Sequence, residues 1–185
     1  MQGEKDHLYH LAKAVEVTLE IGVESCHDQT LLEINRGHDF QVFVDCIAMG
    51  KNRGIQLATH LILGLPNENY TMMIDSIKKL SQMPLDYIKF HQLHIVKNTQ
   101  LGKQYEKKPF ELISKDEYFK LLAEGITYLN PQIKIQRLFG DAPKNLMLSD
   151  PWTGKSSTWT NEFHLYLEEK NLWQGKNFNT TPNYL

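Results

Sequence analysis

Apolar residues in this chain switch between helical and strand spacing three times in succession. A helical pattern over residues 4–14 precedes a strand pattern from Val15 to Val23. The next strand pattern, Ile55 to Leu63, is apolar almost throughout, as expected of a strand covered on both faces of a parallel sheet. A helix with one apolar stripe, over residues 69–82, leads to a third strand from Tyr87 to Leu93. This alternation predicts an α/β fold with a parallel sheet, either open and doubly wound or curved into a barrel wall.

Turn and capping signals predict the remaining elements. The expected helices are a short one capped by Asp28, a longer one from Asp39 to near Gly54, one capped by Ser114, and a last one over residues 161–170. A fourth strand is expected over residues 133–139 and a loop over residues 98–112. The tail beyond Trp173 is rich in Asn, Gly and Thr and is expected to fray.

Composition narrows the classes of function. The 185 residues carry a formal net charge of −2, so no overall positive field favours binding of nucleic acid or anionic lipid. The net charge does not decide whether a local basic patch exists. No apolar run approaches the roughly 20 residues that span a bilayer, and we expect no membrane association. Only Cys26 and Cys46 are present, too few for a disulfide framework, a cysteine zinc site or a complete cluster motif. We therefore expect a reducing, cytoplasmic setting.

Polar residues near the carboxyl ends of the expected strands are the candidates for chemistry, because ligands of parallel α/β sheets gather there. Glu20 and Glu24 share one face of the first strand, with Glu24 at its exit. Two carboxylates on an inward face need a partner or a ligand, whereas on an uncovered edge strand they are simply solvated. Both interpretations stay open at this point.

Histidines occur in or after two of the strands. His60 lies among apolar neighbours, where a single histidine is more often a hydrogen-bonded core residue than a ligand. The Gly64–Pro66 turn that follows needs special backbone angles whatever its function. His91 and His94 could supply two metal ligands, but zinc sites need three or four, so we predict no metal site. Pleat alternation leaves at most one of these two facing inward, unless the strand ends between them.

Four strings of residues resemble one known family. They are Leu-Glu-Ile-Gly-Val-Glu-Ser at 19–25, Ile-Asn-Arg-Gly-His at 34–38, Thr-His-Leu-Ile-Leu-Gly-Leu-Pro-Asn-Glu at 59–68 and Lys-Phe-His-Gln-Leu-His-Ile-Val-Lys at 89–97. In this order they resemble the fourth, fifth and sixth strand regions of radical-SAM iron–sulfur enzymes. The similarity is greatest to the bacterial YhcC type, which is itself similar to the Elp3 and coproporphyrinogen dehydrogenase groups. The resemblance spans roughly residues 5–175.

The resemblance implies a fold and an activity for the whole protein. The fold is a partial (β/α)6 TIM-like barrel, of which residues 1–112 would form the C-terminal half and residues 113–185 a small, irregular, α-rich extension. A 4Fe-4S cluster held by a Cys-x3-Cys-x2-Cys loop would bind S-adenosylmethionine, whose reductive cleavage yields a 5′-deoxyadenosyl radical that acts on an unknown substrate.

The resemblance also implies roles for individual residues. Glu24 and Arg36 match positions that contact the methionine part of S-adenosylmethionine, and His60 matches an aspartate that meets its ribose in coproporphyrinogen dehydrogenases. The Gly64–Pro66 turn matches the family's adenine-facing loop. A planar guanidinium such as that of Arg36 suits a carboxylate, and Glu24 suits an ammonium group. Substrate-facing positions are Glu20, His91, His94, Lys97 and Arg137.

One departure from the family is large. The sequence contains neither the Cys-x3-Cys-x2-Cys motif nor the Gly-Gly-Glu string that normally binds the cofactor amine. We therefore expect a fragment of a radical-SAM enzyme that is inactive alone, has no catalytic residue of its own and holds no cofactor. A missing half-barrel would leave the first strand with an exposed edge, through which we expect dimerisation.

Two functions of other classes stay open. A stand-alone α/β binding module would present Arg36, Lys97 and Arg137 to a phosphorylated or nucleic-acid partner. A hydrolase with a glutamate–histidine site is the weaker alternative, because the sequence has no Gly-x-Ser-x-Gly or His-Glu-x-x-His motif.

Overall fold

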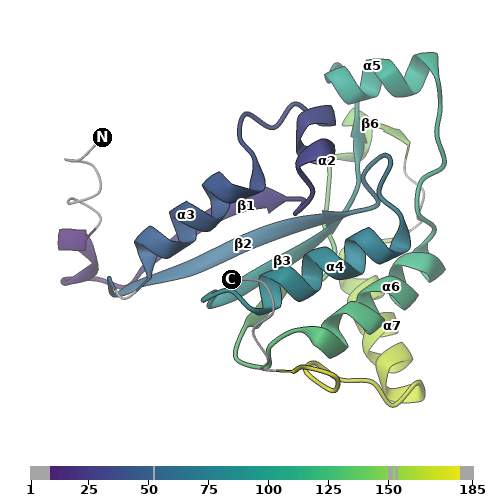
Figure 1. Cartoon of the computed structure of the whole chain (residues 1–185). Helices are drawn as coiled ribbons and strands as arrows, with labels where there is room; N and C mark the ends of the chain where they lie inside the picture. Colours follow the sequence, from purple (N-terminus) through teal and green to yellow (C-terminus); the bar gives the residue numbers. More distant parts are fainter. Residues whose placement is uncertain (1–8, 52, 150–151, 153, 180–185) are drawn as a thin grey trace.

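Four parallel strands form the main sheet of the molecule (Figure 1). They are β1 (Val17–Glu24), β2 (Ile55–Leu63), β3 (Tyr87–Gln92) and β5 (Lys134–Arg137), in the order β1-β2-β3-β5. The computed structural model describes residues 9–51, 53–149, 152 and 154–179. The predicted α/β class with a mostly parallel sheet is confirmed, and in these residues the sheet is open rather than closed into a barrel.

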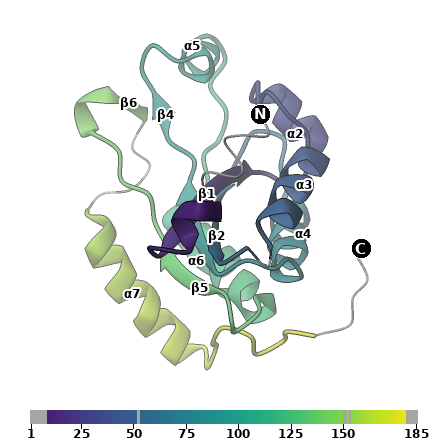
Figure 2. The ribbon, with the colours of Figure 1, turned by 90° about the vertical axis from the view of Figure 1, so that its left-hand side faces the viewer.

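The helices connect and cover these strands. They are α2 (Asp28–Glu33), α3 (Phe40–Gly50), α4 (Tyr70–Ser81), α5 (Gln100–Lys107), α6 (Lys115–Tyr128) and α7 (Ser156–Glu169). Viewed along the sheet, α2, α3 and α4 lie on one side, and α7 lies on the opposite flank beside β5 (Figure 2). None of the helices in the described ranges combines the length and the apolarity needed to cross a bilayer.

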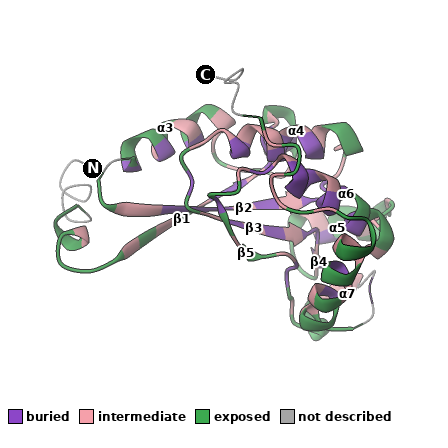
Figure 3. Ribbon diagram, turned by 90° about the horizontal axis from the view of Figure 1, so that it is seen from below, coloured by how far each residue is buried: buried purple, intermediate pink, exposed green. Residues whose placement is uncertain are grey.

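The two faces of the sheet differ in what covers them. Helices α3 and α4 lie over one face of β1, β2 and β3, while no described helix lies over the middle of the opposite face (Figure 3). Strand alternation therefore sends apolar side chains toward the helices and polar ones to the bare face. The prediction that β2 is covered on both faces is wrong, because its His60 lies on the bare face and stays partly exposed.

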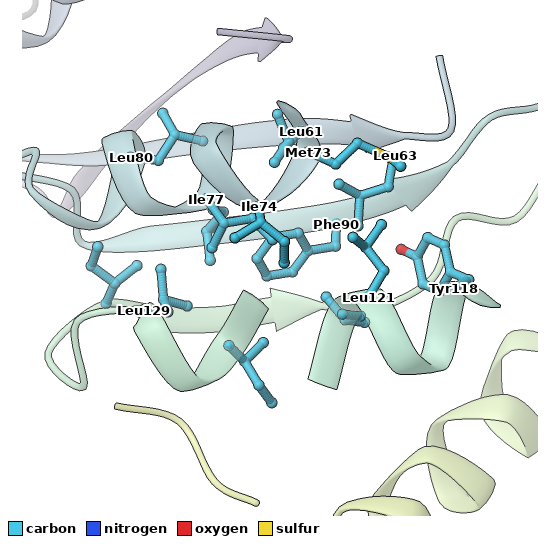
Figure 4. Packing of buried hydrophobic residues seen from close by; sticks show 14 of the residues in the cluster. Leu61, Leu63, Met73, Ile74, Ile77, Leu80, Phe90, Tyr118, Leu121 and Leu129 are labelled. Atoms are coloured by element: carbon cyan, nitrogen blue, oxygen red, sulfur yellow. The ribbon is translucent and has the colours of Figure 1, made fainter. Parts of the chain in front are cut away.

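The apolar core lies between the sheet and the helices α4 and α6 (Figure 4). Leu61, Leu63 and Phe90 of the sheet meet Ile77 of α4 and Leu121 of α6, and all five are at most 1% exposed. Burying a side chain of this size stabilises the fold by roughly 1.5–3 kcal/mol. This layer holds the strands in register and so determines where the polar residues on the other face lie.

Local capping signals correctly predicted the starts of two helices, α3 and α6, whereas the last helix, expected from residue 161, begins at Ser156. Asp39 accepts a hydrogen bond from Val42 N at 3.0 Å, and Ser114 forms a complete capping box with Glu117. The prediction that Asp28 caps α2 is wrong. His27 is the N-cap residue, without a side-chain cap, and the Asp28 carboxylate accepts a hydrogen bond from Phe40 N instead.

The predicted loop over residues 98–112 is also wrong, because α5 forms there. Thr99 caps the helix, and Leu101 and Tyr105 pack into a second apolar cluster with Leu65, Leu93 and Ile95. Gly102, which disfavours a helix by itself, lies so close to β4 that a Cβ there would meet Val96 O at 2.3 Å. Tertiary packing therefore outweighs the weak local signal.

The C-terminal part of the chain is more regular than its sequence indicated. The strands β4 (Ile95–Val96) and β6 (Met147–Ser149) form an antiparallel ribbon that was not predicted, preceded by a short 3-10 helix, η1 (Lys144–Leu146). The predicted fraying beyond Trp173 does not occur at Gly175 and Asn177, whose amides bind α6 carbonyls. The division at residue 112 stays a prediction, although β5, beyond it, belongs to the main sheet. Residues 4–8 of the first predicted helix lie outside the described residues.

Candidate functional site

Polar side chains form a row across the bare face of the sheet. The strand register pairs Gly22 of β1 with His60 of β2, His60 with Lys89 of β3, and Lys89 with Arg137 of β5. Residues paired in register lie on the same face of neighbouring strands. The row therefore contains residues separated by more than 100 positions in the sequence.

His60 is held between two carboxylates of β1. Its Nε2 lies 2.9 Å from Glu24 Oε1 and its Nδ1 lies 3.3 Å from Glu20 Oε1. The hydrogen bond with Glu24 raises the pKa of His60 above its ordinary value. Lys89 donates a hydrogen bond to Glu20, and this contact lowers the pKa of the Glu20 carboxyl group. The two glutamates thus have partners on the bare face and do not simply extend into solvent.

The backbone of β1 is shaped to allow this arrangement. A bulge between Gly22 and Glu24 shifts the register with β2, and Glu24 has a φ of 62°, in the left-handed region. A Cβ on Gly22 would lie 2.3 Å from His60 Nε2 and 2.5 Å from Glu24 Oε1. Glycine at this position therefore leaves the space in which the His60–Glu24 pair forms.

Arg36 reaches the same end of β1 from the turn after α2. Its Nη2 donates to the carbonyl of Gly22 at 2.7 Å, which positions the guanidinium group. Its Nε is buried and has no hydrogen-bond partner among the described residues, and the same holds for Nδ1 of the nearby His38. A buried donor without a partner costs free energy, and an anionic ligand would remove that cost. A carboxylate is the kind of group that this guanidinium fits.

On the other side of His60 the row continues through His91 to Arg137. The His60 and His91 rings lie 5.8 Å apart, edge to face, and Arg137 Nη1 lies 3.5 Å from His91 Nε2. Burial, with the positive charge of Arg137, lowers the pKa of His91 to about 4. His91 is therefore neutral at neutral pH and presents Nε2 to the arginine as an acceptor.

The strand β3 ends at Gln92, between the two histidines. Gln92 is buried and makes two hydrogen bonds with the backbone of Gly140, at 3.0 and 2.9 Å. A Cβ on Gly140 would meet His91 Nδ1 at 2.5 Å and His94 Cε1 at 3.3 Å, so both histidines pack beside this glycine. In the described part of the chain no group of three or more His, Cys, Asp or Glu residues could hold a metal ion.

Other predicted site residues lie away from the row. Gly64 and Pro66 line a separate hollow of about 870 Å³ between the β2–α4 loop and the α5–α6 linker. Gly64 has a φ of +89°, and a Cβ there would meet Ile113 at 2.9 Å. Lys97 extends over the β4–β6 ribbon and donates to Asn145 O at 2.9 Å.

Four residues of the site were missed by sequence reasoning. The strings that resemble the known family contain all four, Lys89, Gln92, His38 and Glu68, but sequence reasoning gave none of them a role. Glu68 follows β2 and accepts a hydrogen bond from Ser25 after β1, so it joins the two loops beside the row. Burial raises the pKa of the Glu68 carboxyl group. The alternation of Lys89 with buried Ile88 and Phe90 is the one signal that could have found its face.

The two cysteines do not make a cluster site. Burial raises the pKa of the Cys26 thiol to about 12, and its Sγ lies 3.7 Å from Ser76 O. Cys46 lies on α3 at the helix-covered side. Two thiols are fewer than the cysteine ligands of an iron–sulfur cluster, and these two come from separate elements. These residues do not fit an iron–sulfur cluster.

Comparison with known proteins finds one family. The model of the radical SAM superfamily matches residues 2–80, and that of the radical SAM C-terminal domain matches residues 85–169. Protein YtqA of Bacillus subtilis is 33% identical over 94% of this chain and 54% of its own length. Protein YhcC of Escherichia coli is 32% identical over 83% of this chain and 50% of its own length. The chain spans about half the length of these curated relatives.

More distant similarity extends to Elongator complex protein 3. The yeast protein is 25% identical over 77% of this chain. The structure of Elp3 from the archaeon Methanocaldococcus infernus superposes with a TM-score of 0.80, at 17% identity, over 91% of this chain and 40% of that one. At this identity the structural likeness shows the fold alone.

Proposed function

We propose that this chain, which belongs to the radical SAM superfamily, binds the S-adenosylmethionine of a radical-SAM enzyme with the bare face of its sheet. The observation that supports this proposal is the convergence of Glu24, Arg36 and His60 at the carboxyl end of β1, within contact distance of one another or of Gly22. Polar groups at the carboxyl ends of parallel strands are the usual ligand site of such a sheet.

Each of these three side chains suits one part of the cofactor. Arg36 offers a buried Nε donor without a partner, which suits the cofactor's carboxylate. Glu24 suits the ammonium group, and His60, held by two glutamates, can hydrogen-bond a ribose hydroxyl. Gly22 keeps the space between them open. The chain's task is to orient the cofactor and to keep water from it.

Reductive cleavage of S-adenosylmethionine at a 4Fe-4S cluster is the chemistry that such a site supports, and it supplies a radical for an unknown substrate. The two cysteines here do not suit the cluster, so we propose that its ligands lie elsewhere in the parent protein. It follows that this chain alone would not cleave the cofactor. Its own residues bind and orient, and none of them transfers the electron.

The test is anaerobic reconstitution of the complete gene product, followed by measurement of 5′-deoxyadenosine with a reductant. Arg36→Met is expected to raise the KM for S-adenosylmethionine by roughly tenfold or more, because a charge-assisted hydrogen bond is lost. Arg53→Met removes the same charge from an exposed turn and is expected to change nothing. If the wild-type protein forms neither a cluster nor 5′-deoxyadenosine, or if both variants behave alike, the proposal fails.

The binding-module alternative has less support. Lys97 is hydrogen-bonded to Asn145 on the β4–β6 ribbon, and Arg36 is held by the Gly22 carbonyl. The three cations of that hypothesis come from the α2 turn, the ribbon and β5. Among the described residues, no contact joins these three cations into one continuous basic surface.

A further inference from the structure

A second hollow, of about 660 Å³, lies beside the last strand of the sheet. Five consecutive residues, 135–139, line it, so it includes side chains from both faces of β5 and runs along the edge of the strand. In the described sheet this edge of β5 pairs with no other strand. Helix α7 forms the opposite wall, beside β5 in Figure 2. Pockets of this volume commonly bind small molecules.

The walls of this hollow combine apolar and polar side chains. Thr160, Phe163, His164, Leu167 and Glu168 are spaced so that one face of α7 looks onto β5. Leu172 and Trp173 close the far end, and Trp173 is 53% exposed. The side of the hollow formed by Leu167, Leu172 and Trp173 therefore suits an aliphatic or aromatic group.

One end of the hollow is lined by the charged side chains of Arg137 and Asp141. Arg137 lines it and has no carboxylate within ion-pair distance among the described residues. The Asp141 carboxylate accepts a hydrogen bond from Ser156 at 2.6 Å and keeps its negative charge beside the first turn of α7. The dipole of α7 stabilises negative charge at this end of the hollow. Glu168 lies about 16 Å farther along the helix axis from Ser157.

Arg137 also belongs to the row on the bare face. Its guanidinium contacts His91, the ring of His91 contacts that of His60, and His60 contacts Glu24. A ligand bound at Arg137 would therefore lie at the edge of the candidate S-adenosylmethionine site. This is where the substrate of a reaction on that face would need to be anchored.

We propose that the hollow between β5 and α7 binds the substrate, and that this substrate is an amphipathic anion whose carboxylate or phosphate group pairs with Arg137. The assignment of the ligand as the substrate rests on the proposed function. The binding itself does not, because it needs only residues of this chain. The apolar part of the ligand lies against Leu167 and Trp173.

The test is a fluorescence titration of this chain without cluster or cofactor. Trp173 lines the hollow while Trp152 and Trp159 are buried, so a ligand there is expected to change the Trp173 emission. The probes are 4-phenylbutyrate, its uncharged amide and phenyl phosphate. The carboxylate is expected to bind roughly tenfold or more tightly than the amide, because only it can pair with the arginine. Tighter binding of phenyl phosphate would identify phosphate as the anionic group.

Variants assign the effect to Arg137. Arg137→Met is expected to weaken binding of the carboxylate probe to the level of the amide. Arg53→Met, the charge-matched control, is expected to leave the affinity for both probes unchanged. Leu167→Ser should weaken both probes alike, with circular dichroism used to check that each variant is folded. Equal binding of carboxylate and amide by the wild-type chain, or no saturable change, would overturn the proposal. Loss of 5′-deoxyadenosine formation by the parent protein would instead overturn the proposed function and leave this result standing.

Discussion

The same strands form both faces of the sheet, but the two faces differ in composition and in role. On the helix-covered face, Ile88 and Phe90 of β3 are 0% exposed, while Lys89 between them has a side chain that is 20% exposed on the bare face. The first face is apolar and continuous with the core, and the second consists of paired charges and histidines. Stability is concentrated on one side and candidate chemistry on the other, one residue apart along the chain.

The largest expected difference between the faces is in the free energy of unfolding. Phe90→Ala empties part of the core and is expected to cost about 3–5 kcal/mol, as large-to-small changes in a packed interior do. Lys89→Ala, one position away, removes a partly exposed ion pair and should cost about 1 kcal/mol or less. Chemical denaturation of both variants measures this. Equal losses would mean that the bare face contributes to the fold as much as the core does.

A smaller loss in the free energy of unfolding is expected at Gly22, because the absence of a side chain there leaves room for the His60–Glu24 contact. Gly22→Ala places a Cβ where His60 and Glu24 meet, and the resulting overpacking should cost about 1–3 kcal/mol. The pKa of His60, followed by NMR, should fall because its contact with Glu24 is lost. Gly37→Ala is the control, since no heavy atom lies within 4 Å of a Cβ there. An unchanged His60 pKa in Gly22→Ala would contradict the role given to this glycine.

The pH dependence of stability should differ between the two histidines of the row. The pKa of His60 is raised in the folded protein, so its contribution is present at low pH and is lost as the pH rises through that value. The pKa of His91 is lowered to about 4, so its neutral form favours folding above about pH 6.5 and stability falls between pH 6.5 and 4. Melting temperatures across this range should show a shallower acid decline in His91→Asn and a shallower alkaline decline in His60→Asn. The same slopes in both variants would refute the assignment.

The smallest expected effect concerns the edge of the sheet at β1. We propose that this edge pairs with a second copy, since in the described sheet β1 pairs only with β2 and its outer edge offers free backbone groups. Light scattering at micromolar concentration should then show a dimer, and Thr18→Lys on the exposed part of β1 should reduce it. Thr158→Lys, on the surface of α7, is the matched control. A wild-type monomer with well-protected β1 amides would exclude this pairing.

Much of the fold could be predicted because its signals are local. The order of strands and helices followed from apolar spacing, and Asp39 and Ser114 start helices as their side chains indicated. The candidate site was only partly foreseen. Glu24, Arg36 and His60 do lie close together, but the partner of Glu20 was not evident, because Lys89 is 69 residues away.

What the sequence alone determined is therefore the type and order of most elements, because periodicity and caps depend on residues within a few positions of one another. Only the tertiary structure decided which face of the sheet stays bare, that α5 is helical, and that Arg137 reaches both His91 and the hollow beside α7. These features depend on contacts between residues far apart in the chain. These features arise when the helices pack on one face of the sheet, and a pattern of neighbouring side chains in the sequence does not predict that packing.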